Sequence, residues 1–281
     1  MKTLKSTLVL IIAIVLLAAP GQLLAKKKIE LKYRLHQNDK FVTKSSTNQN
    51  IEMQNQGQTV DIQSITTQDV TTVVEKVAAN SIATSSTIDK ITLSQSVFGR
   101  KINYDSSDPS TYASGPAKTL GDKFNKMIGK SYLTVLDDLG HVISIDMSQV
   151  TGDENKVAGS LNSDDSYIVF PNHSVEVGDT WEAEIKPIKS SDMVVSVKYT
   201  LNKVSGNEAV IGIEAKISAS KVADNNMTMS GVQNGEATVD IRNGWTTKLN
   251  LDQEVKMEVQ QNGMSIPMTI SGTITKTSEE K

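Results

Sequence analysis

The sequence contains no cysteine in its 281 residues. This absence excludes disulfide bonds, thiolate metal ligands, a cysteine nucleophile and an N-terminal cysteine that could carry a lipid. Aromatic residues are also scarce, at 4%, and the formal net charge is only -3. So weak a charge gives no strong electrostatic attraction to nucleic acid. If the protein is exported, its stability must come from the burial of apolar side chains.

Long apolar runs are missing too, apart from one near the N-terminus. Lys2 and Lys5 precede the apolar run 8–18, and a lysine cluster follows Ala25. This order is typical of a secretory signal peptide, residues 1–25, with cleavage after Ala25. The alternative is a retained anchor, but the run is shorter than the roughly 20 residues that a membrane-spanning helix needs. We therefore expect an exported protein, periplasmic or extracellular, with no transmembrane span after the signal is removed.

Thr, Ser, Val and Ile are abundant, and these residues suit the pleated, half-buried surface of a β-strand. Gln56-Gly57 and Asn262-Gly263 have the composition of hairpin turns, and 279–281 is expected to be a frayed, charged tail. We predict a mainly β fold, an antiparallel curved sheet or half-barrel. The segment 29–42 alternates and contains a turn at 36–39, after which Phe41 opens the next strand, and 45–64 is expected to form polar strands on either side of Gln56-Gly57. The other predicted strands are 70–77, 82–96, 102–104, 132–136, 142–147, one that starts at Trp181, 193–204, 209–220, 235–241, 245–259 and 266–274.

One segment has a helical period. Apolar residues recur at helical spacing between Pro116, which suits a first turn, and Gly129, which suits a C-terminal stop. We predict a helix over 116–129, and a second, shorter helix over 154–161. The first helix has two interpretations: an amphipathic helix packed on the sheet, or a lid that helps to enclose an apolar ligand. Its apolar residues are Leu120, Phe124, Met127 and Ile128.

The stretch from Phe170 to Trp181 combines a turn with the start of a strand. Gly178 permits a positive φ, and the Asp179 carboxylate can accept backbone N–H groups of the turn. Trp181 can bury a large side chain where the sheet begins. We therefore expect a structural corner, with Asp179 and Trp181 as folding residues and not as catalytic ones.

A similar stretch, 35–41, opens the chain beyond the predicted signal, with Asn38 and Phe41 in the places of Gly178 and Trp181. We expect a single domain, 26–281, built of two related halves, 29–150 and 171–277. Chance similarity between β-rich segments is the alternative. Three further pairs of segments occur in the same order: 70–80 with 197–207, 99–105 with 235–240, and 140–145 with 244–249.

The turn 175–181 after Phe170-Pro171, with Gly99, Tyr104-Asp105 and the segment 138–142 upstream, resembles an uncharacterised family of secreted bacterial β-rich proteins. The resemblance covers most of the chain beyond residue 25. It implies an envelope or secreted location and no known activity. No functional residue can be carried over from it.

Three histidines are candidates for chemistry: His36, His141 and His173. None has a second histidine or a carboxylate at metal-ligand spacing, so we expect exposed turn positions for all three. The aspartate pairs 137–138 and 164–165 fit turns better than a glycosidase carboxylate pair. The segment 115–119 lacks the glycine before lysine that a phosphate loop requires. We therefore predict no catalytic, metal-binding or cofactor-binding residue and no cofactor, and assign no ligand-binding residue.

Three functions are weighed. The first is a non-enzymatic envelope protein that binds an apolar or amphipathic ligand, such as a lipid, in the curved sheet. The second is a structural or protein-interaction module of the cell envelope or exterior, and the third, least favoured, is a hydrolase. The methionines at 227, 229, 257, 264 and 268 suit an adaptable apolar surface, although they could equally fill the core. The face of each strand that points inward depends on register, which the sequence leaves open along with the oligomeric state.

Overall fold

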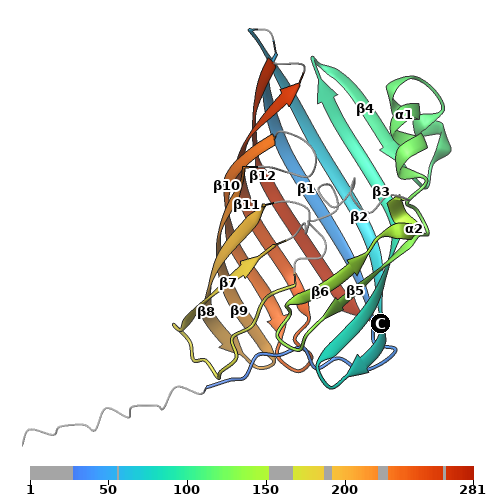
Figure 1. Cartoon of the computed structure of the whole chain (residues 1–281). Coiled ribbons are helices and arrows are strands. Elements are labelled where there is room, and N and C mark those ends of the chain that lie inside the picture. The colour runs from blue at the N-terminus through green and yellow to red at the C-terminus, as the bar shows by residue number, and fades with distance from the viewer. Residues whose placement is uncertain (1–27, 56, 152–166, 187–191, 221–226, 262–263) are drawn as a thin grey trace, which may run out of the picture.

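The structure is a computed structural model that describes residues 28–55, 57–151, 167–186, 192–220, 227–261 and 264–281. These residues form a single antiparallel sheet of 12 strands that curves strongly and stays open, with β6 and β7 at its two ends (Figure 1). The prediction of a mainly β fold with a curved antiparallel sheet is confirmed. The predicted signal peptide and the helix predicted at 154–161 lie outside the described residues.

The first wing of the sheet holds six strands and the helices: β1 (Lys40–Asn55), β2 (Gln58–Ala78), β3 (Ser81–Val97), β4 (Arg100–Asp105), the 3-10 helix η1 (Pro109–Tyr112), α1 (Gly115–Phe124), β5 (Ser131–Leu136), β6 (Val142–Asp146) and α2 (Ser148–Thr151). The second wing holds the other six strands: β7 (Thr180–Ile185), β8 (Val194–Ser205), β9 (Glu208–Ala219), β10 (Met227–Asp240), β11 (Thr246–Gln261) and β12 (Met264–Glu280).

The strand order is β6-β5-β3-β2-β1-β12-β11-β10-β9-β8-β7, with β4 paired to the outer half of β3. Each wing is therefore a meander, and the two meanders join where β1 pairs with β12. Because β12 lies in the middle of the sheet, the prediction of a frayed tail is wrong. Glu280 pairs with Phe41, and the Lys281 N–H donates to the Lys40 carbonyl at 2.9 Å. Ladder bonds hold this end while its charged side chains point to solvent.

The predicted helix is shorter than expected. It ends at Phe124, and residues 125–129 form turns that close at Gly129, whose φ is +70°. The Asn125 side chain accepts a hydrogen bond from the Tyr104 hydroxyl at 2.9 Å, and the Met127 N–H bonds back to the Phe124 carbonyl, so the helical pattern stops there. No helix among the described residues is long and apolar enough to span a bilayer.

The core lies at one end of the sheet, here called the base, where the chain ends in Figure 1. Both wings contribute to one cluster: Val74 and Leu136 from the first, Tyr199 and Leu201 from the second. Opposite wings can share a cluster only if the sheet curves around it. We call the face that carries this cluster the inner face; it is the concave side of the sheet.

The segment 29–37 fastens the two wings at the base. Alternate burial of its apolar side chains was predicted and is found, but in place of a paired strand it makes only scattered bonds. Ile29 forms a bridge with Val175, the Tyr33 N–H donates to the Asp138 carbonyl, and the Arg34 N–H donates to the Asn243 carbonyl. These acceptors lie in turns of opposite wings, so the segment acts as a strap across the base.

The two predicted corners share one hydrogen-bond pattern. Asn38 and Gly178 both have positive φ, at 75° and 101°. Asp39 and Asp179 each accept the backbone N–H three residues earlier through Oδ2, at 2.7 and 2.9 Å. Each corner is also held by the second strand that follows it in the chain. The backbone of Val74 in β2 bonds to Asn38 and Asp39, and the backbone of Leu201 in β8 bonds to Gly178 and Asp179. These matches support our proposal that the two halves are related.

One segment pair of the proposed repeat, 99–105 with 235–240, does not occupy equivalent places in the sheet. β3 pairs Ile82 with Leu136 of β5, and β9 pairs Ala209 with Val239 of β10. The end of β10 therefore occupies the place of β5, whereas β4 leaves the main strand order and carries α1 with it. The bulges beside Val74 and Leu201 fall at corresponding positions.

Replacing Trp181 with Ala is expected to destabilise the protein by roughly 3–5 kcal/mol. Its side chain is only 7% exposed, stacks on Tyr199 at 5.5 Å between centroids, and donates from Nε1 to the Val169 carbonyl at 2.7 Å. Urea unfolding measures the change. Val177→Ala in the same corner, at a 39% exposed side chain, is the control and should cost less than about 0.5 kcal/mol. Equal effects of the two substitutions would contradict this view of the corner.

The base should also weaken in strong alkali. Burial raises the pKa of Tyr199 to about 12 and raises the pKa of Tyr33 as well. The folded state then holds protons that the unfolded state has released, so stability is full below about pH 10 and falls as the pH rises toward 12. We expect Tyr199 alone to account for roughly 2–3 kcal/mol of this loss. Urea unfolding across this pH range should show a shallower decline in the free energy of unfolding for Tyr199→Phe, which cannot ionise. A decline as steep as that of the wild type would contradict the assignment of this loss to Tyr199.

Candidate functional site

Above the base core, the inner face continues up the strands as rows of cross-strand neighbours. Directly paired residues lie on the same face, so the register defines each row. The isoleucine row takes one residue from each strand in the order β3-β2-β1-β12-β11-β10-β9-β8-β7. The methionine row lies next to it, farther from the base. The isoleucine row is Val97, Ile62, Ile51, Ile270, Val255, Gly231, Ile217, Val195 and Ile185. The methionine row is Val60, Met53, Met268, Met257, Met229 and Ala219.

Across the strands β3, β2, β1, β12, β11 and β10, a polar row separates these apolar rows from the base core. This glutamine row contains Gln95, Ser64, Gln49, Gly272, Gln253 and Gln233. The Gln233 amide donates to the Gln253 carbonyl oxygen at 3.2 Å. Amide side chains offer donors and acceptors without charge. The inner face is therefore layered: packed core, neutral polar row, then two apolar rows.

The apolar rows are less enclosed than the core. Met53, Met268, Met257 and Met229 are all half-buried, unlike Phe41 or Leu201 at the base, which are fully buried. An unbranched thioether side chain adapts its shape easily to what it contacts. The two rows thus form a broad, partly accessible apolar surface on the concave side of the sheet.

Glycines in the central strands allow the sheet to bend around this surface. A Cβ on Gly231 would come within 2.7 Å of the Glu254 carbonyl oxygen, and one on Gly272 would collide with the Asn48 carbonyl. Backbone atoms cannot move aside as a flexible side chain can. Such close approaches are typical of glycine kinks in strongly curved sheets.

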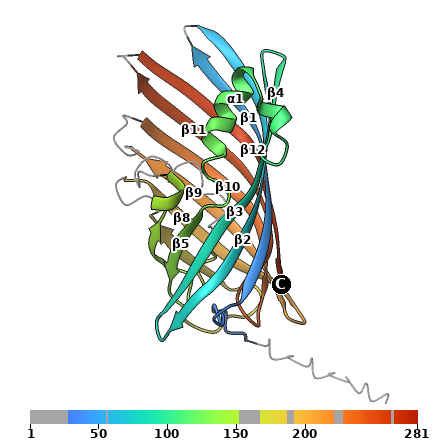
Figure 2. The same ribbon diagram turned by 90° about the vertical axis from the view of Figure 1, so that its right-hand side faces the viewer.

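The helix α1 covers one flank of the inner face. Leu120, Phe124 and Met127 pack against Leu93 and Tyr104 of β3 and β4. Burial raises the pKa of Tyr104 to about 12. Of the two interpretations of this helix, a packed amphipathic helix or a lid, these contacts match the packed helix. The helix lies beside β4, at the side of the first wing (Figure 2).

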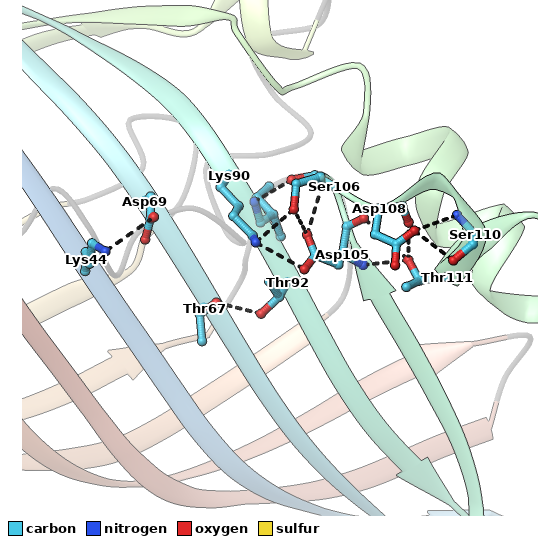
Figure 3. Close-up of polar contacts among 12 residues, drawn as sticks. Lys44, Thr67, Asp69, Lys90, Thr92, Asp105, Ser106, Asp108, Ser110 and Thr111 are labelled. Atoms are coloured by element: carbon cyan, nitrogen blue, oxygen red, sulfur yellow. Dashed lines mark hydrogen bonds and ion pairs between the residues drawn. The ribbon is translucent and has the colours of Figure 1, made fainter.

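The polar contacts around β3 and β4 hold the loop that leads to α1 (Figure 3). Lys90 lies 3.1 Å from the Asp105 carboxylate and donates to the Ser107 hydroxyl at 2.9 Å. Hydrogen bonds from Ser107, and then the Lys90 ammonium, lower the pKa of Asp105. Asp108 accepts from the Ser110 N–H at 3.0 Å and caps η1. The charged side chains of Lys90, Asp105 and Asp108 therefore serve to hold this loop in place.

Each histidine lies in its own turn, as predicted. His36 contacts Asp39 at 3.7 Å, and His141 contacts Asp137 at 2.9 Å. His173 contacts its neighbour Asn172 at 3.2 Å. Within the described ranges, no three His, Asp or Glu side chains are grouped so that they could hold a metal ion.

The remaining candidates from the sequence also have structural positions. The Asp137 Oδ1 atom accepts the backbone N–H groups of Leu139 and His141, which is turn chemistry. The segment 115–119 forms the start of α1. The aspartate pair at 164–165 lies outside the described residues.

The inner-face rows escaped sequence reasoning because they depend on register. The methionine count in the second half was a usable signal, since Met229, Met257 and Met268 all fall in one row. Met53, from the first half, completes it through its pairing with Met268. Only the central pairing of β1 with β12 brings these distant segments together.

Comparison with protein families gives a partial match. Residues 153–246 match a model described as a family of unknown function, DUF6263. This agrees with the expectation of an uncharacterised domain and assigns no activity. The search of curated proteins found no match.

Two solved structures are similar in backbone arrangement to different degrees. The structure titled "Lipid-protein interactions in lipovitellin" aligns over 87% of this chain, with a TM-score of 0.51 and 11% identity. The aligned part is 25% of that chain, so this protein spans about a quarter of its length. The translocator domain of the autotransporter NalP from Neisseria meningitidis aligns over 86% of this chain and 89% of its own, with 9% identity and a TM-score of only 0.25. The first likeness concerns the fold alone.

Gly272→Ala is expected to destabilise the sheet by about 1–3 kcal/mol, because the new methyl group would meet the Asn48 backbone. Thermal or urea unfolding measures the loss. Gly212→Ala in β9 is the matched control, since its Cβ would meet only the flexible Asn202 side chain, at 2.9 Å. The two variants behaving alike would show that close backbone approach does not set the curvature at Gly272.

Proposed function

We propose that the protein is an exported, non-enzymatic protein of the cell envelope that binds an apolar or amphipathic ligand on the inner face of its sheet. The observation that carries this proposal is the pair of apolar rows, which cross the sheet above the core and in which most side chains, including all four methionines of the methionine row, are half-buried. Export rests on the sequence of residues 1–25, which has the order of a signal peptide.

The energetics favour a long apolar chain as the ligand. Each methylene group that leaves water contributes about 0.8 kcal/mol, so a chain lying along a row of side chains gains affinity with its length. Methionine side chains can repack around chains of different shape. The site would therefore discriminate weakly between ligands of similar length.

The glutamine row supports the amphipathic version of the proposal. A ligand could set an ester, amide or hydroxyl group against Gln253 and Gln233, whose amides offer neutral hydrogen bonds. A ligand charge in the same place would be less favourable, because desolvating it without an opposite charge is costly. The likeness to lipovitellin, whose title names lipid–protein interactions, adds support for a lipid as the first class to test.

A second candidate is a structural or protein-interaction module of the envelope. It is favoured by the edge strand β6, where Val142 and Ile145 are 41% and 40% exposed. Exposed apolar residues on an edge strand suit pairing with another protein. An enzyme is the least favoured reading, since each histidine contacts a residue of its own turn.

Binding can be tested with protein purified without detergent. Native mass spectrometry should reveal a copurifying lipid-like mass, and a dansyl-labelled long-chain fatty acid should bind with enhanced fluorescence. Met257→Gln keeps the side-chain volume but places an amide in the methionine row, so affinity should fall about tenfold. Val232→Gln, on the outer face of β10, is the matched control and should bind like the wild type. Absence of both a copurifying ligand and probe binding would refute the proposal.

A further inference from the structure

The turn between β3 and β4 carries an aromatic side chain that the fold leaves in solvent. Phe98 is 71% exposed. It forms, with Gly99, the two-residue turn that joins Val97 to its partner Arg100. No other large apolar residue in the described part of the chain is as exposed. Burial in the core therefore does not explain why a phenylalanine stands here.

The backbone conformation of Phe98 is also unusual for a phenylalanine. Phe98 has a φ of 49° and Gly99 a φ of 75°, so both turn residues lie in the left-handed region. Tight hairpins of this kind prefer Asn-Gly, because a bulky residue is strained at positive φ. The chain uses Asn-Gly at residues 262–263, between β11 and β12. A strained, exposed aromatic in place of asparagine points to a function for the side chain itself.

The charges around this turn are positive. Arg100 and Lys101 follow it directly and are exposed. The segment 97–130, which also contains α1, has six basic and three acidic residues, in a chain whose net charge is -3. Exposed lysines continue through and beyond α1: Lys118, Lys123, Lys126 and Lys130. This flank of the molecule is therefore complementary to an anionic surface.

The position of the turn connects it to the inner face. Val97, the residue before Phe98, is the first member of the isoleucine row. The turn lies at the end of the sheet opposite the base, where the β1–β2 hairpin also turns (Figures 1 and 2). An object touching Phe98 would thus meet the end of the sheet to which the apolar rows extend.

We propose that the Phe98 turn docks the protein on a membrane surface that contains anionic lipids. Phe98 enters the interfacial region of the bilayer, where an aromatic ring is favoured, and Arg100 and Lys101 contact lipid phosphates. The basic flank that includes α1 adds long-range attraction. Docking of this kind sets the apolar rows beside the bilayer, a consequence that rests on the proposed ligand-binding function.

The test is flotation with vesicles of phosphatidylcholine, with and without phosphatidylglycerol. The wild type should bind the anionic vesicles at least about tenfold more strongly than the neutral ones, and high salt should weaken this binding. Phe98→Asn should lower binding about tenfold yet fold at least as stably, because asparagine tolerates positive φ. The double variant Arg100→Ser, Lys101→Ser should show a smaller preference for anionic lipid, and the lysines of the α1 flank account for what remains.

Matched controls are available at the base. Val177→Asn removes an exposed apolar side chain from the second corner, and Lys248→Ser removes an exposed cation from β11; both should bind vesicles like the wild type. Wild-type protein that binds both kinds of vesicle equally, or Phe98→Asn protein that binds as well as the wild type, would overturn the proposal.

The two proposals fail separately. The fatty-acid probe binds in solution, so Phe98→Asn should leave its affinity unchanged. Vesicle binding with neither probe binding nor a copurifying ligand would refute the ligand proposal and uphold the docking of Phe98. Probe binding without a preference for anionic vesicles would refute the docking and uphold the ligand site.

Discussion

Stacking of Phe41 on Trp245, with ring centroids 4.0 Å apart, ties the centre of the sheet together at the base. Phe41 belongs to β1, and Trp245 stands just before β11, on the other side of β12. The Trp245 Nε1 atom donates to the Ser278 hydroxyl of β12, which in turn bonds Thr43 of β1. Three strands from the two ends of the sequence are thus locked at one level. The strap 29–37 and the two corners depend on this lock, because each packs against the cluster that it organises.

Because the core fills only the base, the inner side chains farther along the long strands do not pack against it. A curved sheet buries its inner side chains only where something fills the concavity, and the strap and the segment around Phe170 do so at the base. Farther up, Ile51 and Met53 lie on the same face as Phe41 but are only half-buried. Keeping such residues apolar on both wings has a solubility cost that a purely structural sheet would avoid with polar side chains. This layering supports the proposal that a ligand completes the surface.

The sequence predicted local structure well and global placement poorly, for a physical reason. Turn chemistry is local, so the corner at Gly178 and its partner at Asn38 could be recognised from their residues, and the structure shows both with the same carboxylate bonds. Register is not local. Nothing near Met53 indicates that it will face Met268, because that pairing is decided by the junction of β1 with β12. For the same reason Glu280 looked like part of a loose tail, although its neighbours in space hold it in a ladder.

Positive φ values separate structural from functional use of the turns. Where the fold needs a left-handed residue, the chain supplies one that tolerates it: Asn38 and Gly178 at the corners, Gly140 and Gly244 in the turns that receive the strap. At these turns a Cβ on either glycine would collide with neighbouring backbone, so the choice follows from packing. Phe98 breaks this rule in open space, where the adjoining Gly99 has nothing within 4 Å of its Cβ position. Packing does not require the aromatic ring there, and this exception is the observation behind the proposed docking of Phe98 on a membrane surface.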